Sequence, residues 1–236
     1  DVQTVTHWLG TDLAGRDLLS RTLWGGLISL LVGLVATVVS LVIGVVYGAV
    51  SGYWGGRVDM ILMAIVDVLY GIPYMFLVIL LMVTVGRDII MLFVALGIVQ
   101  WLTMARIVRG QVLSLKQKEF VEAARMSGTS HMGIIFNHLI PNTLGVVIVY
   151  TTLTVPAVIL QESFLAFIGL SVEWQGQARD FWGALIKSGV DALGSDGGHS
   201  WLVLVPSVAM AATLFSLNFL GDGLRDALDP QQRGRT

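Results

Sequence analysis

The sequence predicts an all-α membrane protein, a polytopic helical bundle with five spanning helices. Among its 236 residues, 55% are hydrophobic and only 13% are charged, and the mean hydropathy is +0.80. Soluble domains carry about 25% charged residues, so most of this surface is suited to lipid. Five stretches approach the roughly 20 apolar residues of helix that a bilayer core requires. They are residues 27–50, 60–85, 89–105, 139–161 and 201–220, which together define a spanning domain at 27–220.

Small residues in the first stretch and aromatic residues at span ends support this placement. Gly44, Gly48 and Gly52 recur along one helix face, and small side chains let helices approach closely in lipid. Indole and phenol rings favour the headgroup zone at the ends of spans. The rings near these ends belong to Trp24, Tyr53, Trp54, Trp101 and Trp201.

The distribution of lysine and arginine predicts the orientation of the spans. Basic residues gather in loop 106–138, between the third and fourth spans, and in the tail 221–236. The positive-inside rule places both segments in the cytoplasm. Segment 1–26, expected to include an interfacial helix, and loop 171–200 then lie on the periplasmic side. This arrangement leaves the N-terminus outside, so we expect a sixth span upstream of residue 1.

Motifs for catalysis and for nucleotide or metal binding are absent from the sequence. It contains no cysteine, which excludes disulfides and thiolate chemistry, and its four histidines are scattered without ligand-like spacing. It has no glycine-rich phosphate loop and no nucleophile elbow. The net charge of -2 lacks the basic excess of a nucleic-acid-binding protein. We therefore expect no catalytic residue, metal or cofactor in this chain, and an ATP-driven motor would be a separate chain.

The loop after the third span predicts a compact elbow of two short helices. Residues 119–127 are good helix formers, with acidic residues in the first turn that complement the helix dipole. Gly128 ends this helix, and Ser130 is a suitable N-cap for a second short helix at 131–138. Pro141 follows at the expected membrane edge.

This elbow resembles the cytoplasmic coupling motif of ABC importer permeases. That motif reads Glu-Ala-Ala, three residues, Gly, then nine residues and Ile-x-Leu-Pro. The residues that match at this spacing are Glu122, Ala123, Ala124, Gly128 and Pro141. His138 stands where the motif has isoleucine, and Ile140 stands where it has leucine.

Further segments resemble the dipeptide, oligopeptide and nickel branch of this family, and most closely its C-type oligopeptide membrane subunit. They are residues 9–21, 48–59, 162–170 and 219–230, so the resemblance covers nearly the whole chain. It implies a type I ABC importer permease fold in the bacterial inner membrane, with a cytoplasmic C-terminus. The implied function is peptide import, and a nickel or small-solute importer of the same family is the alternative.

The resemblance also implies partners. They are a second homologous permease, two ATPase subunits that bind ATP and magnesium, and a periplasmic or lipid-anchored peptide-binding protein. The elbow would dock into a cleft on one ATPase subunit, with an apolar face formed by Phe120, Ala123, Ala124 and Met126. Glu122 would either pair with an arginine of that subunit or stabilise the dipole of its own helix. The full set of expected coupling residues is Glu119, Phe120, Glu122, Ala123, Ala124, Met126, Gly128 and Pro141.

Two acidic residues fall inside the expected spans, where an ionisable group indicates function because its burial without a partner is costly. Asp67 precedes Pro73, which is expected to kink the second span. Asp67 would either bond neighbouring helix groups or line a path near a cationic substrate terminus. Glu162 would pair with Arg179 or with the partner permease, or it would line the path.

Loop 171–200 is expected to belong to the surface that receives the binding protein. Loops of this length are usually functional or disordered, so a plain connecting loop is the alternative. Residues 181–190 are predicted to form a short helix at the membrane surface. The expected contacts with the binding protein are Trp174, Arg179, Trp182 and Lys187.

An ion-coupled secondary transporter is the alternative from another class. It would need several polar groups inside the membrane, and typically an internal repeat. The sequence offers two isolated acids and no evident repeat, which argues against it.

Overall fold

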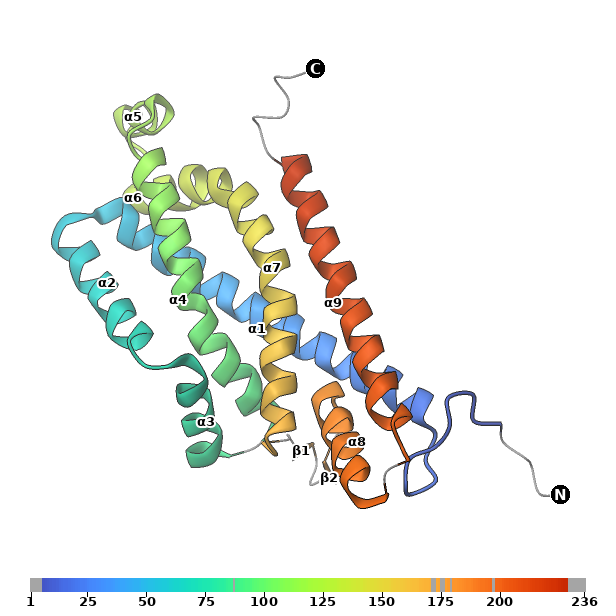
Figure 1. Ribbon diagram of the computed structural model, residues 1–236. Helices are drawn as coiled ribbons and strands as arrows, with labels where there is room; N and C mark the ends of the chain where they lie inside the picture. The colour runs from blue at the N-terminus through green and yellow to red at the C-terminus, as the bar shows by residue number, and fades with distance from the viewer. Residues whose placement is uncertain are drawn as a thin grey trace.

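The computed structural model describes residues 6–86, 88–170, 173–174, 177–178, 180–196 and 198–228. This part of the chain is almost entirely helical, and its long helices form one bundle (Figure 1). The helices are α1 (Leu18–Trp54), α2 (Gly56–Tyr70), α3 (Tyr74–Val85), α4 (Ile89–Leu115), α5 (Glu119–Met126), α6 (His131–Ile134), α7 (Ile140–Phe167), α8 (Trp182–Asp196) and α9 (Trp201–Leu228). A π-helical segment, η1 (Ile135–Leu139), joins α6 to α7.

A small hairpin departs from the all-α prediction. Strands β1 (Glu173–Trp174) and β2 (Gln177–Ala178) pair antiparallel between α7 and α8. They lie at the end of the bundle opposite α5, beside α8 (Figure 1). Below, the end that carries α5 is called the elbow end, and the opposite end is called the α8 end.

The first spanning helix, α1, is longer than its predicted span of 27–50. It begins at Asp17, whose carboxylate accepts a hydrogen bond from the backbone N–H of Ser20 and so caps the first turn. Its 37 residues extend about 55 Å at 1.5 Å per residue, which exceeds the thickness of a bilayer core. The interfacial helix predicted within 1–26 is therefore the first part of α1, because nothing interrupts the helix after this cap.

The second predicted span, 60–85, is two helices. The axes of α2 and α3 are bent by 80° across a short break. Gly71 and Ile72 leave the helix, and Pro73, which has no N–H to donate, precedes the first turn of α3. The predicted kink at Pro73 is confirmed and is a complete break. Among the described residues, four helices are long and apolar enough to span a membrane, and counting the bent pair gives five.

The elbow differs from its prediction at the second helix. α5 and the N-cap at Ser130 lie where the sequence placed them. The helix after Ser130 does not end at 138, because the helical run continues through η1 into α7 over 131–167, with α6 at an angle to α7 (Figure 1). In η1 the N–H of Ile140 donates to the carbonyl oxygen of Ile135. The helical hydrogen bonds thus change from i→i−4 to i→i−5 just before Pro141, which has no N–H with which to continue the α-helical pattern.

Two other predicted boundaries also differ from the structure. α4 continues past residue 105 to Leu115, so the first part of loop 106–138 is helical. α9 continues to Leu228, so the predicted tail 221–236 begins inside a helix. In both cases polar residues extend the helix after the apolar stretch has ended, because hydropathy marks the edge of the lipid and not the end of a helix.

Glycines bring α1 into close contact with α4. A Cβ atom added at Gly48 would lie 2.3 Å from the carbonyl oxygen of Ala105, and one at Gly52 would lie 2.9 Å from that of Arg109. Gly44 meets the same helix one turn earlier. Only residues without a side chain permit this approach, so the packing predicted from the spacing of the three glycines is confirmed.

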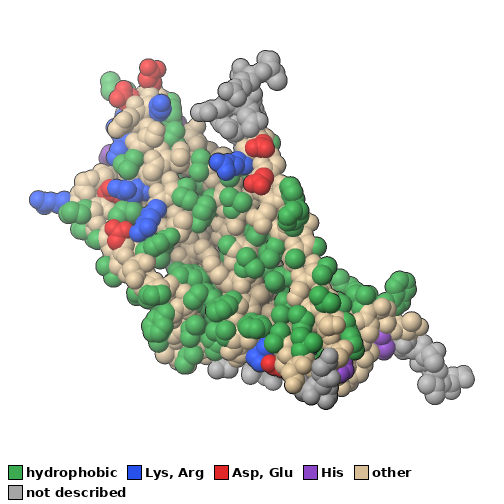
Figure 2. Space-filling model, in the orientation of Figure 1, with side chains coloured by type: hydrophobic (Ala, Val, Ile, Leu, Met, Phe, Trp, Pro, Cys, Tyr) green, Lys and Arg blue, Asp and Glu red, His purple; other side chains and the backbone are tan. Residues whose placement is uncertain are grey.

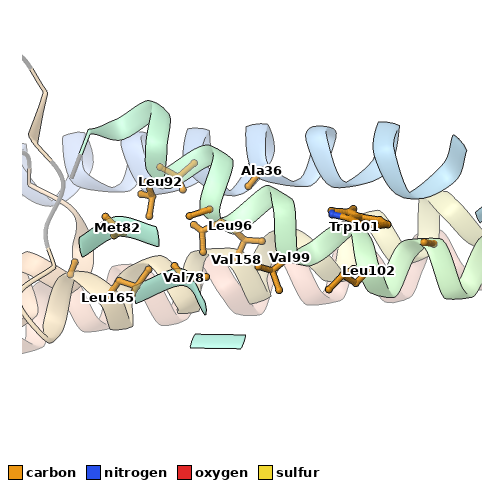
Figure 3. Packing of buried hydrophobic residues seen from close by; sticks show 14 of the residues in the cluster. Ala36, Val78, Met82, Leu92, Leu96, Val99, Trp101, Leu102, Val158 and Leu165 are labelled. Carbon is orange, nitrogen blue, oxygen red and sulfur yellow. The ribbon is translucent and has the colours of Figure 1, made fainter. Parts of the chain in front are cut away.

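Apolar side chains from α1, α3, α4 and α7 fill the centre of the bundle. Ala36, Val78, Leu96 and Val158, one from each helix, are among them (Figure 3). Many apolar side chains also cover the outer surface, and charged side chains gather mainly at the elbow end (Figure 2). An apolar exterior of this kind is suited to lipid and to neighbouring membrane helices.

The contact between α1 and α4 predicts a large effect of one methyl group. We expect Gly48→Ala to lower stability by about 1–3 kcal/mol, because the new Cβ overlaps a backbone oxygen that cannot move aside. Gly110→Ala on α4 is the matched control, because no heavy atom lies within 4 Å of its added Cβ. The thermal midpoint of the purified protein in detergent tests this, and equal midpoints for the two variants would contradict it.

Candidate functional site

The elbow has one face packed on the bundle and one face exposed. In α5, Val121 and Ala124 are buried against an apolar cluster that includes Val112 and Ile134. On the opposite face Phe120 and Ala123 are exposed. Met126 is 89% exposed, an unusual position for a large apolar side chain at an otherwise charged end of the molecule. Together with Phe120 and Ala123 it forms an exposed apolar patch beside charged residues, and such patches mark surfaces that bind other proteins.

Ala124 corrects the expectation that four apolar side chains share the outer face. It lies three residues after Val121, close to one helical turn, and only 8% of it is exposed. The outward apolar face consists of Phe120, Ala123 and Met126. The charged residues Glu119 and Glu122 are exposed beside it.

Gly128 fixes the angle between α5 and α6. Its φ of +77° lies in the left-handed region, which side chains with a branched Cβ rarely adopt. The N–H of Thr129 donates to the carbonyl of Ala124 at 3.1 Å, closing the end of α5. Ser130 then caps α6 by accepting from the N–H of Gly133 at 3.1 Å. The turn therefore has a defined shape with little freedom to bend.

The elbow is also attached to the end of α1. The hydroxyl of Tyr53 lies 2.7 Å from Nδ1 of His131. The rings of Trp54 and His131 lie 5.1 Å apart, and the guanidinium of Arg125 lies 5.6 Å from the centre of the Tyr53 ring. These contacts join α5, α6 and α1, so a force on the elbow reaches α1 as well as α7.

A second connection at this end was not predicted from the sequence. Arg109 on α4 donates to both carboxylate oxygens of Asp59 on α2, from Nε at 2.5 Å and from Nη2 at 2.6 Å. The hydroxyl of Ser51 donates to the same carboxylate at 2.6 Å. Lys116 donates to the carbonyl of Gly52 at 2.8 Å. The sequence offered one indication of this pair, because Asp59 is an acidic residue at the start of a span and Arg109 and Lys116 are basic residues at the same end of the bundle.

The break between α2 and α3 borders a cavity of about 410 Å³. Within it, Oε1 of Gln161 accepts hydrogen bonds from the hydroxyl of Tyr74 and from Nε2 of Gln100, the latter at 2.9 Å. Sequence reasoning found Pro73 but missed this group, although two glutamines inside apolar spans are an unusual pattern. Residues of the lining include Tyr70, Tyr74, Val99, Gln100, Thr103 and Gln161.

The two acids predicted at membrane depth occupy different surroundings. Asp67 is exposed and forms an ion pair with Arg106, whose Nη2 lies 2.6 Å from its Oδ1. The Arg106 guanidinium also lies 4.1 Å from the centre of the Tyr70 ring. Glu162 is buried and accepts from the hydroxyl of Ser29 on α1 at 2.9 Å. The side chain of Glu162 therefore connects α7 to α1 instead of facing an open path.

The residues predicted to contact a binding protein differ in their exposure at the α8 end. α8 confirms the helix predicted at 181–190, and Lys187 is partly exposed beside Asp191, 2.6 Å away. Trp182 is a correction, because only 4% of it is exposed. The side chain of Trp174 and all of Arg179 lie outside the described residues.

The burial of Trp182 has a local cause on α1. Its Nε1 donates to the carbonyl oxygen of Thr22 at 3.0 Å. A Cβ added at Gly26 would lie 2.5 Å from the indole ring, so this glycine forms the notch that the ring fills. Trp182 therefore holds α8 against α1 and is not available to a partner in this conformation.

Charged side chains join the N-terminal segment to the α8 end. Arg21 donates from Nε to Asp180 at 2.7 Å and from Nη1 to Asp12. Burial alone raises the pKa of Asp12, but hydrogen bonds from Arg16 and the charges of Arg21 and Arg16 outweigh it, so this pKa is lowered. At neutral pH Asp12 therefore stays ionised. Among the described residues, no group of three or more histidine or acidic side chains could hold a metal ion.

A polytopic helical bundle with an exposed elbow at one end has the architecture of the membrane subunit of an ABC importer. The chain belongs to the family of binding-protein-dependent transport system inner membrane components, whose family model matches residues 40–234. Members of this class are non-enzymatic permeases that work in complexes with ATPase and permease subunits. The chain is accordingly a multi-pass protein of the inner membrane.

Relatives of known function and a solved structure agree with this assignment. The oligopeptide transport system permease protein OppC of Escherichia coli K12 is 52% identical over 96% of this chain and 73% of that relative. The dipeptide transport system permease protein DppC of Bacillus subtilis is 48% identical over 96% of this chain and 69% of its own length. A chain of the MetNI methionine ABC transporter, solved in inward-facing conformations, has a TM-score of 0.69 at 18% identity, over 90% of this chain and 98% of that chain. This last similarity confirms the predicted type I importer permease fold.

The geometry of the elbow predicts that Gly128 tolerates some residues and not others. We expect Gly128→Val to abolish transport while the protein stays in the membrane, because a branched side chain at φ +77° costs about 1–2 kcal/mol or more and reshapes the turn. Gly128→Asn is the control, because asparagine adopts this conformation more readily. Substrate uptake and the amount of protein in membranes are measured together. Normal uptake by the valine variant would contradict the prediction.

Proposed function

We propose that this chain is a permease subunit of an ATP-driven importer that carries peptides, oligopeptides or dipeptides, across the bacterial inner membrane. The elbow is the observation that supports this proposal most directly. Its outward face of Phe120, Ala123 and Met126 is exposed and not packed against another helix in the described part of the chain. The names of its relatives, which are oligopeptide and dipeptide permeases, support the choice of substrate.

In this proposal the elbow is cytoplasmic and docks on one ATPase subunit. Each of two ATPase subunits binds ATP and magnesium, and this chain binds no cofactor. A second permease completes the path, and the C-terminus lies in the cytoplasm. The positive-inside rule supports this orientation, because the basic side chains of Arg106, Arg109 and Arg125 lie towards the elbow end.

The elbow has the shape that mechanical coupling requires. Gly128 and the Ser130 cap set the angle of the turn, and η1 joins it to α7 without interruption. Contacts between Tyr53 and His131 connect it to α1. Closure of the ATPase pair would therefore move α1 and α7 together. Glu122 is exposed, which leaves it free to pair with an arginine of the ATPase subunit.

The periplasmic or lipid-anchored binding protein would approach the α8 end. Lys187 is partly exposed there, and Trp174 and Arg179 remain proposed contacts. Trp182 is withdrawn from this set because it is buried. The ion pairs of Arg21 with Asp12 and Asp180 would hold this surface in shape for docking.

Uptake measurements separate this proposal from its alternatives. In membrane vesicles that contain the assembled transporter and its binding protein, we expect tri-alanine to accumulate only when ATP is present on the cytoplasmic side. An uncoupler should leave this uptake unchanged. Uptake that an uncoupler abolishes would indicate a secondary transporter, and uptake of nickel ions in place of peptide would indicate the nickel importer that is the alternative within the family.

The docking of the elbow predicts a specific effect of Met126→Asp. Burying a methionine contributes about 1.5–3 kcal/mol, so we expect the ATPase subunits to bind roughly 10–100-fold more weakly. The chain itself should fold normally, because Met126 makes little contact with it. Ser114→Asp, which places the same charge at an exposed position on α4, is the control. Co-purification of the ATPase subunits is the measurement, and undiminished co-purification of the Met126 variant would contradict elbow docking.

A further inference from the structure

The cavity at the α2–α3 break combines irregular backbone with uncharged polar side chains. Helix α2 ends at Tyr70 and α3 begins at Tyr74. The N–H of Gly71 still donates to the carbonyl of Asp67, but the N–H of Ile72 donates to that of Leu69 at 3.3 Å and Pro73 has no N–H, so the regular ladder ends here. Backbone of this kind is tolerated at membrane depth only where it is buried in protein or lines a water-filled cavity. At about 410 Å³, the cavity is within the size range of sites that bind small molecules.

The polar side chains of the cavity carry both hydrogen-bond donors and acceptors. Oε1 of Gln161 already accepts from Tyr74 and Gln100. Nε2 of the same Gln161 amide carries two N–H groups, which are further donors at this position. Tyr70 and Thr103 add hydroxyl groups, 3.2 Å apart, on the side nearest Arg106. These groups can both donate and accept.

The surface beside the cavity is not suited to lipid. Asp67 lies about one helical turn from Tyr70, and its side chain is 66% exposed while it pairs with Arg106. An ion pair exposed to hydrocarbon would be strongly unfavourable, and such groups face a bundle interior or a water-filled cavity. The side of α2 that carries Asp67 and Tyr70 therefore faces water or a second protein.

We propose that the cavity between the α2–α3 break, α4 and α7 is a subsite of the transport path that binds the main-chain amides of a passing peptide. The proposal rests on the proposed function of peptide import and names where this chain would contact the substrate. Nε2 of Gln161 would donate to a peptide carbonyl, and the hydroxyls of Tyr70 and Thr103 would pair with peptide N–H and C=O groups.

The chemistry of the lining favours main-chain groups over side chains or termini. Among the described residues, no charged side chain lines the cavity, so this lining offers no ion pair to a peptide terminus or to a lysine or glutamate of the substrate. Amide and hydroxyl groups match the alternating donors and acceptors of an extended backbone. A subsite of this kind would bind the peptide backbone without selecting the side chains of the substrate.

The absence of cysteine from the chain provides a direct test. Thr103→Cys places a single thiol in this chain on the wall of the cavity, and its reaction with a maleimide is followed on this subunit in vesicles of the assembled transporter. We expect tri-alanine, added with binding protein and ATP, to slow labelling. Occupancy at twice the dissociation constant would slow it about threefold. Ser114→Cys, outside the cavity, is the control and should label at the same rate with and without peptide.

Uptake of tri-alanine is measured in the same vesicles, so failure of the subsite and failure of the proposed function are distinguishable. Normal uptake with no protection of the thiol at position 103 overturns the subsite and leaves peptide import intact. If the Thr103 variant does not assemble, Ile72→Cys, at the break itself, replaces it with the same two outcomes. Protection by tri-alanine but not by an equal concentration of maltose supports recognition of the peptide backbone, and equal protection by both overturns it.

Discussion

The structure depends on the close approach of α1 to α4, where glycines on one helix meet backbone atoms of the other. Gly48 and Gly52 lie so near the carbonyls of Ala105 and Arg109 that no side chain fits between the helices. In lipid there is no hydrophobic force between apolar helices, so contact of this kind supplies the attraction. The contact fixes the position of α4, which carries Gln100 and Arg106 on the cavity side and ends beside the elbow.

The two functional regions are consequently parts of one frame. The elbow reaches α1 through Tyr53 and His131, and α1 reaches α7 through the hydrogen bond between Ser29 and the buried Glu162. The residue before Glu162 is Gln161, whose amide lies in the cavity. A displacement at the elbow is thereby passed through packed helices and hydrogen bonds to the polar groups at the break. The ion pair of Asp59 with Arg109 joins α2 to the same frame.

Local features were predictable from the sequence, and long-range pairings were not. The spans follow from hydropathy, and the elbow turn follows from Gly128 and Ser130, because each depends on residues that are neighbours in the chain. Trp182 was predicted to contact a partner, but it is buried in a notch at Gly26. Gly26 is far away in the sequence, so local reasoning could not find this contact. Pro73 indicated a kink, but the size of the bend depends on packing against α4. The hydrogen bond between Gln100 and Gln161 joins two different spans. The spacing of residues within one helix cannot predict such a contact.

The helical run from His131 to Phe167 connects the elbow to the opposite end of the bundle without an intervening loop. Helix α7 alone has 28 residues and is about 42 Å long, so a tilt of only about 10° displaces one end by roughly 7 Å relative to the other. The π-helical turn η1 joins the base of α7 to α6, so the chain remains helical up to Pro141 in the first turn of α7. Small angular changes at the base are thereby magnified into movements large enough to open or shut a passage of molecular width.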